Sequence, residues 1–326
     1  MANIFQPRTN YKPFEYSHIT DPLIKAMWAG HWTHNEFNFK ADVQDFKTKL
    51  SIEEQGVVQR SVLLISQIEI AVKSYWSNLG KLLPKPEIAD MGAVFGGIEV
   101  IHSRAYSEIL TILELDEQFN EMLKEPVVKN RVTYLSKYVN KIYKNDKKNI
   151  LYSLVLFTLF TEATSLFSQF YAILGFNRYN NVLKDIANII AYTSKEEDLH
   201  KEGGILLINQ IKSEEPDLFD EEFKAKILEE VQEAYLSEVE LVRWILKGYK
   251  NEFLSQEILT SYIQYRLNES LVKIGIEAPF EIAQETIAKF FWMEEEVLAP
   301  SNSDFFFKKR IDYQKNTKSF SASELF

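Results

Sequence analysis

Long segments of the chain carry apolar residues every three or four positions, which is the spacing of one helix face. A capping box at Ser51–Glu54 opens one such segment, which ends before Pro84, and Pro86 opens the next, which extends to about Leu115. Only 11 glycines and 9 prolines occur among the 326 residues. The pattern therefore predicts an all-α fold of long helices rather than a sheet of short strands.

The same pattern predicts further helices, each bounded by turn or capping residues. They cover residues 21–30, 117–124, 127–143, 182–211, 223–247, 255–273 and 281–297. Residues 1–20 lack a period and are predicted to form an extended arm, and residues 144–148 are predicted to form a surface loop. The pattern is lost after Pro300, which predicts a helical domain over residues 1–299 and a flexible tail over residues 300–326.

Residues 149–175 are the most apolar part of the sequence and are long enough to span a bilayer. Glu162 lies at the middle of this segment, where a bilayer would penalise it by roughly 2.5–3.5 kcal/mol or more. No asymmetry of basic residues flanks the segment. We therefore expect a central helix buried on all sides, and no membrane partner.

Two glutamates stand in apolar surroundings, Glu69 within residues 62–72 and Glu162 within residues 149–175. Burying an unpaired carboxylate costs several kcal/mol, so each of them requires a cation or a proton. Each is followed, on the next predicted helix, by a Glu-x-x-His motif that begins at Glu99 or at Glu197. Residues at i and i+3 lie on one helix face, so the carboxylate and the imidazole of each motif point the same way.

A single Glu-x-x-His motif is most often a solvated helix face. Two isolated glutamates and two such motifs, alternating on four long helices, instead match the ligand pattern of di-iron and dimanganese helical bundles. The candidate metal ligands are Glu69, Glu99, His102, Glu162, Glu197 and His200. Four carboxylates with only two imidazoles favour iron or manganese over zinc or copper.

Two aromatic residues are candidates for redox chemistry beside such a centre. Tyr106 lies one helical turn after His102, where a dimetal centre could oxidise it, although a packed core tyrosine would fit the same position. Trp32 stands in a short polar setting, where packing in the core or at an interface is the simpler explanation.

Charge, motifs and cysteine content argue against several further classes of function. The formal net charge is −10, which disfavours nucleic acid as a partner, and neither Gly-x-Gly-x-x-Gly nor a phosphate-binding Gly-Lys-Ser/Thr loop occurs. The chain contains no cysteine, which excludes disulfides, thiolate catalysis and cysteine metal sites within it. The first ten residues have no apolar core of signal-peptide length, so we expect a cytoplasmic location.

These motifs resemble those of the small, radical-generating subunit of class I ribonucleotide reductase, and the likeness covers nearly the whole chain. Residues 99–106, Glu-Val-Ile-His-Ser-Arg-Ala-Tyr, are similar to that family's metal-ligand and radical-tyrosine motif. Residues 194–200, Ser-Lys-Glu-Glu-Asp-Leu-His, are similar to its second ligand motif. Glu162, within Phe-Thr-Glu-Ala-Thr-Ser-Leu-Phe, matches the family's buried ligand on the intervening helix.

The resemblance implies a homodimeric ferritin-like bundle with extra helices, holding two iron or manganese ions per chain. An oxidant on Tyr106 or on the metals would pass through His102, Glu196 and Trp32. It would then reach a mobile-tail tyrosine, which Tyr313 resembles, and finally a cysteine of a separate large subunit that reduces ribonucleotides to deoxyribonucleotides. Residues 319–326, Ser-Phe-Ser-Ala-Ser-Glu-Leu-Phe, resemble the peptide that docks in the large subunit.

Two residues depart from the family pattern, because Glu69 and Glu196 each stand where the best-known members have aspartate. A longer side chain changes the metal spacing and the hydrogen bonding around the tyrosine. Some manganese-using subgroups carry such a glutamate, so the resemblance leaves the metal and the seat of the oxidant open. Two alternatives of other classes remain at this point: a ferritin-like metal storage protein and a stand-alone dimetal oxidase of small apolar ligands.

Overall fold

The computed structural model describes residues 3–12, 14–139 and 146–298, without the side chains of residues 70, 71 and 136–139. The regular elements in these ranges are all helical, which confirms the all-α prediction. The α-helices are α1 (Ser17–Ala29), α2 (Lys40–Thr48), α3 (Ile52–Ser77), α4 (Leu79–Leu82), α5 (Pro86–Ile112), α6 (Asp116–Met122), α7 (Pro126–Val139), α8 (Lys147–Leu156), α9 (Phe167–Asn180), α10 (Lys184–Glu214), α11 (Glu221–Leu246), α12 (Gln256–Lys273) and α13 (Gln284–Leu298). A π-helix, Phe157–Ser165, joins α8 to α9, and 3-10 turns occur at His34–Glu36 and Pro216–Leu218.

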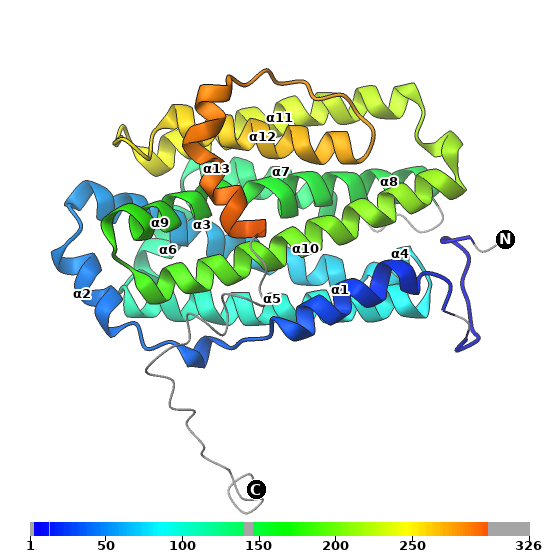
Figure 1. The fold of residues 1–326 in the computed structure, drawn as a ribbon, viewed down its shortest axis with the longest axis horizontal. Helices are drawn as coiled ribbons and strands as arrows, with labels where there is room; N and C mark the ends of the chain where they lie inside the picture. The colour runs from blue at the N-terminus through cyan, green and yellow to red at the C-terminus, as the bar shows by residue number, and fades with distance from the viewer. Residues whose placement is uncertain (1–2, 13, 140–145, 299–326) are drawn as a thin grey trace, which may run out of the picture.

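Helices α3, α5, α9 and α10 and the π-helix form the centre of the bundle. Helix α3 packs along α5 and also contacts α9, while α10 packs against α5, α9 and the π-helix. Helices α1 and α5 lie along one side of the molecule, α11 and α12 run along the opposite side, and α10 crosses between them (Figure 1). Close approach of α10 to the π-helix depends on Gly204, because a Cβ there would collide with the side chain of Thr158.

Several helix ends form as the sequence predicts. The Ser51 hydroxyl accepts a hydrogen bond from the Glu54 amide, and the Glu54 carboxylate accepts one from the Ser51 amide, which completes the capping box of α3. Pro86 is the first residue of α5. Gly248 and Gly275 adopt positive φ angles of 86° and 82° just after α11 and α12, as expected of glycines that terminate helices.

The N-terminal part of the fold departs from the prediction. Helix α1 begins at Ser17, so Pro22 lies inside it rather than at its start. The Tyr16 carbonyl accepts hydrogen bonds from the amides of Ile19 and Thr20, and the apolar face of the segment is buried, so packing outweighs the local preference of proline. The segment before α1 packs against the bundle, because Arg8 forms a salt bridge with Glu87 on α5.

Other boundaries also differ. Helix α2 has no counterpart among the predicted helices, and the helix predicted to run to Pro84 instead ends at Ser77 and is followed by the separate α4. Lys147 and Lys148, placed in a loop by the prediction, form the first turn of α8, where the Asp146 side chain accepts the Asn149 amide. Residues 140–145 and 299–326 lie outside the described residues, and with them the end of the helix predicted at 127–143, the predicted tail and Tyr313.

The apolar central segment is the one helix of the described residues, Lys147–Asn180, that is long and apolar enough to cross a membrane, and 94% of its most apolar window is buried inside the bundle. This confirms the prediction of a central buried helix. The sequence did not predict that residues 157–165 would form a π-helix. Its freed carbonyls find partners elsewhere: Thr164 donates to the Leu159 carbonyl, Arg131 to that of Ser165, and Arg266 to that of Ala163.

Candidate metal centre

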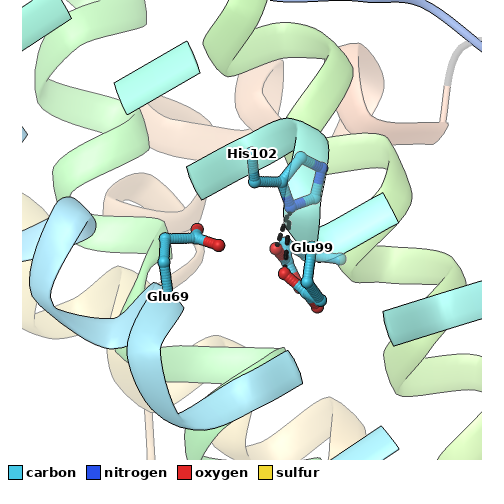
Figure 2. A group of neighbouring side chains, drawn as sticks. Glu69, Glu99 and His102 are labelled. Carbon is cyan, nitrogen blue, oxygen red and sulfur yellow. Dashed lines mark hydrogen bonds and ion pairs between the residues drawn. The ribbon is translucent and has the colours of Figure 1, made fainter. Parts of the chain in front are cut away.

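The six predicted ligands come together inside the bundle, although they lie on four separate elements. Each is at most 1% exposed. Helix α3 contributes Glu69, α5 contributes Glu99 and His102, the π-helix contributes Glu162, and α10 contributes Glu197 and His200. Figure 2 shows Glu69 on its own helix, facing the helix that carries Glu99 and His102.

These side chains form two overlapping groups, each of which could hold one metal ion. Glu69, Glu99, His102 and Glu197 form the first group, and Glu99, Glu162, Glu197 and His200 form the second. Within each group the potential ligand atoms all lie within 4.8 Å of one another. Glu99 and Glu197 belong to both groups, so their carboxylates have the position expected of ligands that bridge two metal ions.

Both imidazoles turn Nδ1 toward the carboxylates. His102 Nδ1 lies 3.2 Å from Glu99 Oε2 and 3.2 Å from Glu197 Oε1. His200 Nδ1 lies 3.0 Å from Glu99 Oε1 and 3.2 Å from Glu197 Oε2. The two groups are thus related by an approximate pseudo-symmetry, in which each histidine faces both of the shared glutamates.

Burial and mutual repulsion disturb the ionisation of the acidic groups. Burial, reinforced by the charge of Glu99, raises the pKa of Glu69 well above its usual value, and burial followed by the charge of Glu197 does the same to Glu162. Burial also acts to raise the pKa of Glu197, but hydrogen bonds with His102 and His200 outweigh it and hold that pKa low. With both histidines as hydrogen-bond partners, Glu197 remains a carboxylate.

The histidines respond in the opposite sense. Burial alone would lower the pKa of His102, but its hydrogen bonds to Glu196, Glu197 and Glu99 raise that pKa well above the usual value. The pKa of His200 is likewise raised by the carboxylates around it, Glu99 foremost, against the effect of burial. The cluster therefore attracts positive charge at its centre.

The donor set fits two divalent cations. Both carboxylate oxygens of Glu69, and one oxygen of Glu162, are buried without a hydrogen-bond partner. Leaving so many buried acceptors unsatisfied is costly, and a bound cation would satisfy them together. Four carboxylates and two neutral imidazoles carry a formal charge of −4, which two divalent ions neutralise.

Glu196 and Trp32 extend the hydrogen-bonded cluster beyond His102. The Trp32 indole Nε1–H donates to both carboxylate oxygens of Glu196, at 3.1 and 3.0 Å. The same carboxylate lies 2.7 Å from Nε2 of His102. Glu196 thereby connects the indole to the imidazole and favours the tautomer of His102 whose Nδ1 is free to bind a metal.

Tyr106 is fully buried on α5, one turn beyond His102. Burial, followed by the negative charge of Glu69, raises the pKa of its phenol well above 10, while His102 and the Thr193 side chain act to lower it. The structure thus brings Trp32, Tyr106 and Glu196 to the predicted neighbourhood. Of the predicted site residues, Tyr313 alone lies outside the described residues.

Trp76 also belongs to the site, although it is not among the residues predicted from the sequence. Its indole Nε1–H donates a hydrogen bond of 2.8 Å to Oε1 of Glu162, and its ring lies 5.5 Å from that of His200, measured between centroids. Trp76 follows Glu69 by seven residues on the same helix, a spacing that places both on one face. The spacing could therefore have identified Trp76 from the sequence as a residue that faces the same site as Glu69.

A sequence profile of the family described as "Ribonucleotide reductase, small chain" matches residues 8–287. This span contains all six candidate ligands, together with Trp32, Tyr106 and Glu196. The chain belongs to the ribonucleotide reductase small-chain family. Members of this family are subunits of an oxidoreductase, ribonucleoside-diphosphate reductase. Membership confirms the main function predicted from the sequence and does not favour a metal storage protein or a stand-alone oxidase.

The individual ribonucleotide reductase proteins to which this chain is similar share little sequence identity with it. The probable ribonucleoside-diphosphate reductase small subunit of Invertebrate iridescent virus 3 is 25% identical over 329 residues, which cover 96% of this chain and 86% of the viral protein. A solved structure of a putative class I ribonucleotide reductase from Bacillus halodurans has a TM-score of 0.77 and 24% identity, covering 85% of this chain and 99% of that one. Dimanganese(II)-NrdF from Streptococcus sanguinis has a TM-score of 0.74 and 17% identity, covering 87% and 97%. These likenesses confirm the ferritin-like fold.

Proposed function

We propose that this protein generates the oxidant of a class I ribonucleotide reductase at a pair of iron or manganese ions. The ligands of these ions would be Glu69, Glu99, His102, Glu162, Glu197 and His200. The observation that carries the proposal is that Glu99 and Glu197 are shared by two buried ligand groups in a chain of this family. A bound metal pair of this kind supplies a one-electron oxidant after reaction with dioxygen or a reduced oxygen species.

The residues of the chain position and protect this chemistry. Glu99 and Glu197, which belong to both groups, would help to hold both ions, while Glu69 with His102 would hold one ion and Glu162 with His200 the other. The site is lined by fully buried rings, such as Phe95 beside His200, which shield it from bulk solvent.

Trp32 is proposed to conduct the oxidant outward. Oxidation of an indole releases the Nε1 proton, and Glu196 already accepts a hydrogen bond from that atom. Electron and proton can therefore leave Trp32 together, with the proton held on the Glu196 carboxylate. His102, hydrogen-bonded to the same carboxylate, connects this step to the ligand cluster.

The partner is proposed to be a separate large subunit that carries the substrate and its cysteines, since this chain contains no cysteine. Residues 319–326 are proposed to dock in it, with Tyr313 next in line to be oxidised after Trp32. A homodimer and a cytoplasmic location are part of the same proposal.

The metals are the first point to test. The protein is loaded separately with Fe²⁺, with Mn²⁺ and with both, and metal content and electron paramagnetic resonance spectra are recorded after exposure to dioxygen or superoxide. We expect about two ions per chain and an oxidised, paramagnetic product with at least one loading. Its combination with a large subunit should then convert ribonucleoside diphosphates to deoxyribonucleotides. Metal uptake without any oxidised product would favour storage instead.

The docking role of the tail is tested by deletion and by competition. Deletion of residues 319–326 is expected to abolish binding to the large subunit and to leave metal content intact, because none of the six candidate ligands lies in this segment. A synthetic peptide of these residues should compete with the intact protein. Full-strength binding after the deletion would contradict the docking assignment.

The variant Tyr106→Phe, which removes only the phenolic oxygen, tests whether the oxidising equivalent is stored on Tyr106 or on the metals. If Tyr106 carries a radical, the variant loses both activity and the tyrosyl signal. Retained activity would place the oxidising equivalent on the metals and leave the reaction class unchanged.

A further inference from the structure

An open pocket outside the candidate metal centre lies between α3, α6 and the end of α11. Its volume is about 420 Å³, within the range of pockets that hold small molecules. The most buried part of its lining is apolar, because Leu63 and Met122 are each 3% exposed and the half-buried ring of Trp244 lines the pocket with them. This part of the pocket suits an apolar group of a ligand.

Trp244 also brings a polar group that lacks a partner. Its indole Nε1 is buried and has no hydrogen-bond partner among the described residues. A buried N–H donor without a partner is costly, and native structures usually satisfy such a group. A ligand in the pocket that carries an acceptor can supply the missing partner.

Arg60 is held in a fixed position at the edge of this pocket. Its Nε donates a 2.7 Å hydrogen bond to the Ile245 carbonyl near the end of α11. The guanidinium lies against Gly56, one turn earlier, where a Cβ would come within 2.9 Å of Nη1. Within the described part of the chain no carboxylate pairs with this cation, and burial alone lowers its pKa. Arg60 is therefore a half-buried, pre-positioned cation that an acid group of a ligand would neutralise.

The two sides of the pocket carry opposite charges. Arg60 and Lys247 stand on the side of α3 and α11, whereas Glu117, Glu121 and Glu125 stand on the side of α6. Two cations against three carboxylates give the pocket a formal charge of −1. A nucleotide would bring several phosphate charges beside three glutamates, which disfavours it. A molecule with one acid group and one amine matches both sides.

We propose that this pocket binds a small zwitterion with an apolar side chain, of the α-amino acid class. The carboxylate of the ligand pairs with Arg60, its ammonium group faces the glutamates of α6, and its side chain covers Leu63 and Met122. This binding goes beyond the proposed function and is independent of it, because the pocket shares no residue with the candidate ligand set.

Isothermal titration calorimetry of the full-length protein with L-phenylalanine and with L-methionine tests the site. We expect saturable binding of at least one of them, with one site per chain. Phenylpropionate lacks the ammonium group of L-phenylalanine, and phenethylamine lacks its carboxylate. Each should bind at least about tenfold more weakly than L-phenylalanine, because each loses a charged contact. Glycine, which lacks the apolar side chain, should bind more weakly still.

Two variants test the contact with Arg60. Arg60→Met keeps most of the side-chain volume and should weaken amino acid binding at least about tenfold. Gly56→Ala lies outside the pocket lining, but its Cβ would displace the guanidinium, and alanine favours the helix, so α3 should stay folded. Should Arg60→Met fail to fold by circular dichroism, Gly56→Ala still decides. Arg243→Met is the matched control, at an exposed arginine of α11 that does not line the pocket, and should bind like the parent.

Nuclear magnetic resonance of the five tryptophan indoles locates the bound amino acid. It should shift the Nε1–H signal of Trp244, which is assigned by its loss in Trp244→Phe. The site would be overturned by the absence of saturable binding, by parent affinity in both Arg60→Met and Gly56→Ala, or by shifts at other indoles with none at Trp244. Each of these outcomes leaves the proposed function standing, and a protein that forms no oxidant with any metal would leave this site standing.

Discussion

The indole Nε1–H of Trp76 donates a 2.8 Å hydrogen bond to Oε1 of Glu162. Trp76 and Glu69 lie two turns apart on α3, so this one helix supplies a candidate ligand to the first group and orients a candidate ligand of the second. The other oxygen of Glu162 lies 3.6 Å from His200 Nδ1, facing the cluster. Trp76 therefore determines which carboxylate oxygen of Glu162 is available to a metal.

Replacing this donor should weaken one of the two metal positions. In Trp76→Phe the ring remains but the N–H is lost, so Glu162 Oε1 loses its hydrogen-bond partner and the carboxylate can rotate. We expect the affinity for the weaker-bound metal to fall about 10- to 100-fold. Competition titration of Mn²⁺ against a chelator measures this. Trp244→Phe, at a half-buried tryptophan on α11, is the control, and equal affinities in the two variants would refute the orienting role.

Glu69 should destabilise the metal-free protein and stabilise the metal-bound one. Its two oxygens are buried without hydrogen-bond partners, and its pKa is raised by burial and by Glu99. Glu69→Leu has a similar volume and removes the buried carboxyl. We expect the free energy of unfolding of the metal-free protein to rise by about 1–4 kcal/mol, while metal content falls toward one ion per chain.

Urea unfolding with and without metal, together with metal analysis, tests whether stability of the metal-free protein rises while metal binding falls. Glu229→Leu, at an exposed position of α11, is the matched control and should change neither quantity appreciably. A Glu69→Leu protein that is less stable without metal, yet still binds two ions, would show that Glu69 has a structural role instead.

The clustering of the six candidate ligands could be predicted from the sequence because each of the signals is local. A lone glutamate in an apolar segment implies a buried charge, and Glu-x-x-His places two donors on one helix face. Alternation of these signals on successive helices then predicts that Glu69, Glu99, Glu162 and Glu197 meet. The structure brings them together on α3, α5, the π-helix and α10.

What could not be predicted depends on contacts between distant segments. The π-helix around Glu162 is stabilised by Arg131 and Arg266, which lie 31 and 104 positions from Glu162 in sequence and bind the carbonyls that it frees. Helix α2 is short and is positioned by hydrogen bonds to the start of α10, so its own sequence carries little signal. Helix α1 starts before Pro22 because tertiary burial outweighs a local preference.

The junction of α2 and α10 should make stability depend on pH. Oδ2 of Asp42 accepts the Ile186 amide at 2.7 Å, yet burial raises the pKa of Asp42 to about 6 from 3.8. At a pH between these two values, the carboxyl group of Asp42 keeps its proton in the folded protein but has lost it in the unfolded chain. The free energy of unfolding should therefore fall by about 3 kcal/mol as the pH rises from about 4 to above 6, at 1.36 kcal/mol per unit.

Asp42→Asn removes this titration but retains an oxygen that can accept the Ile186 amide. The difference in unfolding free energy between parent and variant should change across that pH range, and reversible urea unfolding at several pH values measures it. Asp90→Asn, at an exposed position of α5, is the control and should keep a constant difference from the parent. Parallel curves for the parent and Asp42→Asn would contradict the prediction.

Arg266 joins three segments, the π-helix that carries Glu162, α10 and α13. Its Nε donates to the Ala163 carbonyl at 2.8 Å, next to Glu162, and its terminal nitrogens pair with Glu294 on α13 and Asp198 on α10. Arg266→Met would keep most of the side-chain volume but leave two carboxylates without this cation and one π-helix carbonyl without its donor. Breaking a buried pair in this way should cost about 3–5 kcal/mol of unfolding free energy.

A double-mutant cycle distinguishes loss of the ion pair from loss of packing. Glu294→Gln removes the charge that Arg266 neutralises, while its side chain can still accept the Tyr262 hydroxyl. If the ion pair carries the effect, the double variant should lose less unfolding free energy than the two single variants lose together. The difference should be at least about 1 kcal/mol. Strict additivity would mean that Arg266 acts through the Ala163 carbonyl and Asp198 alone. In that case Arg266→Met should still weaken metal binding, because the carbonyl that it releases lies next to Glu162.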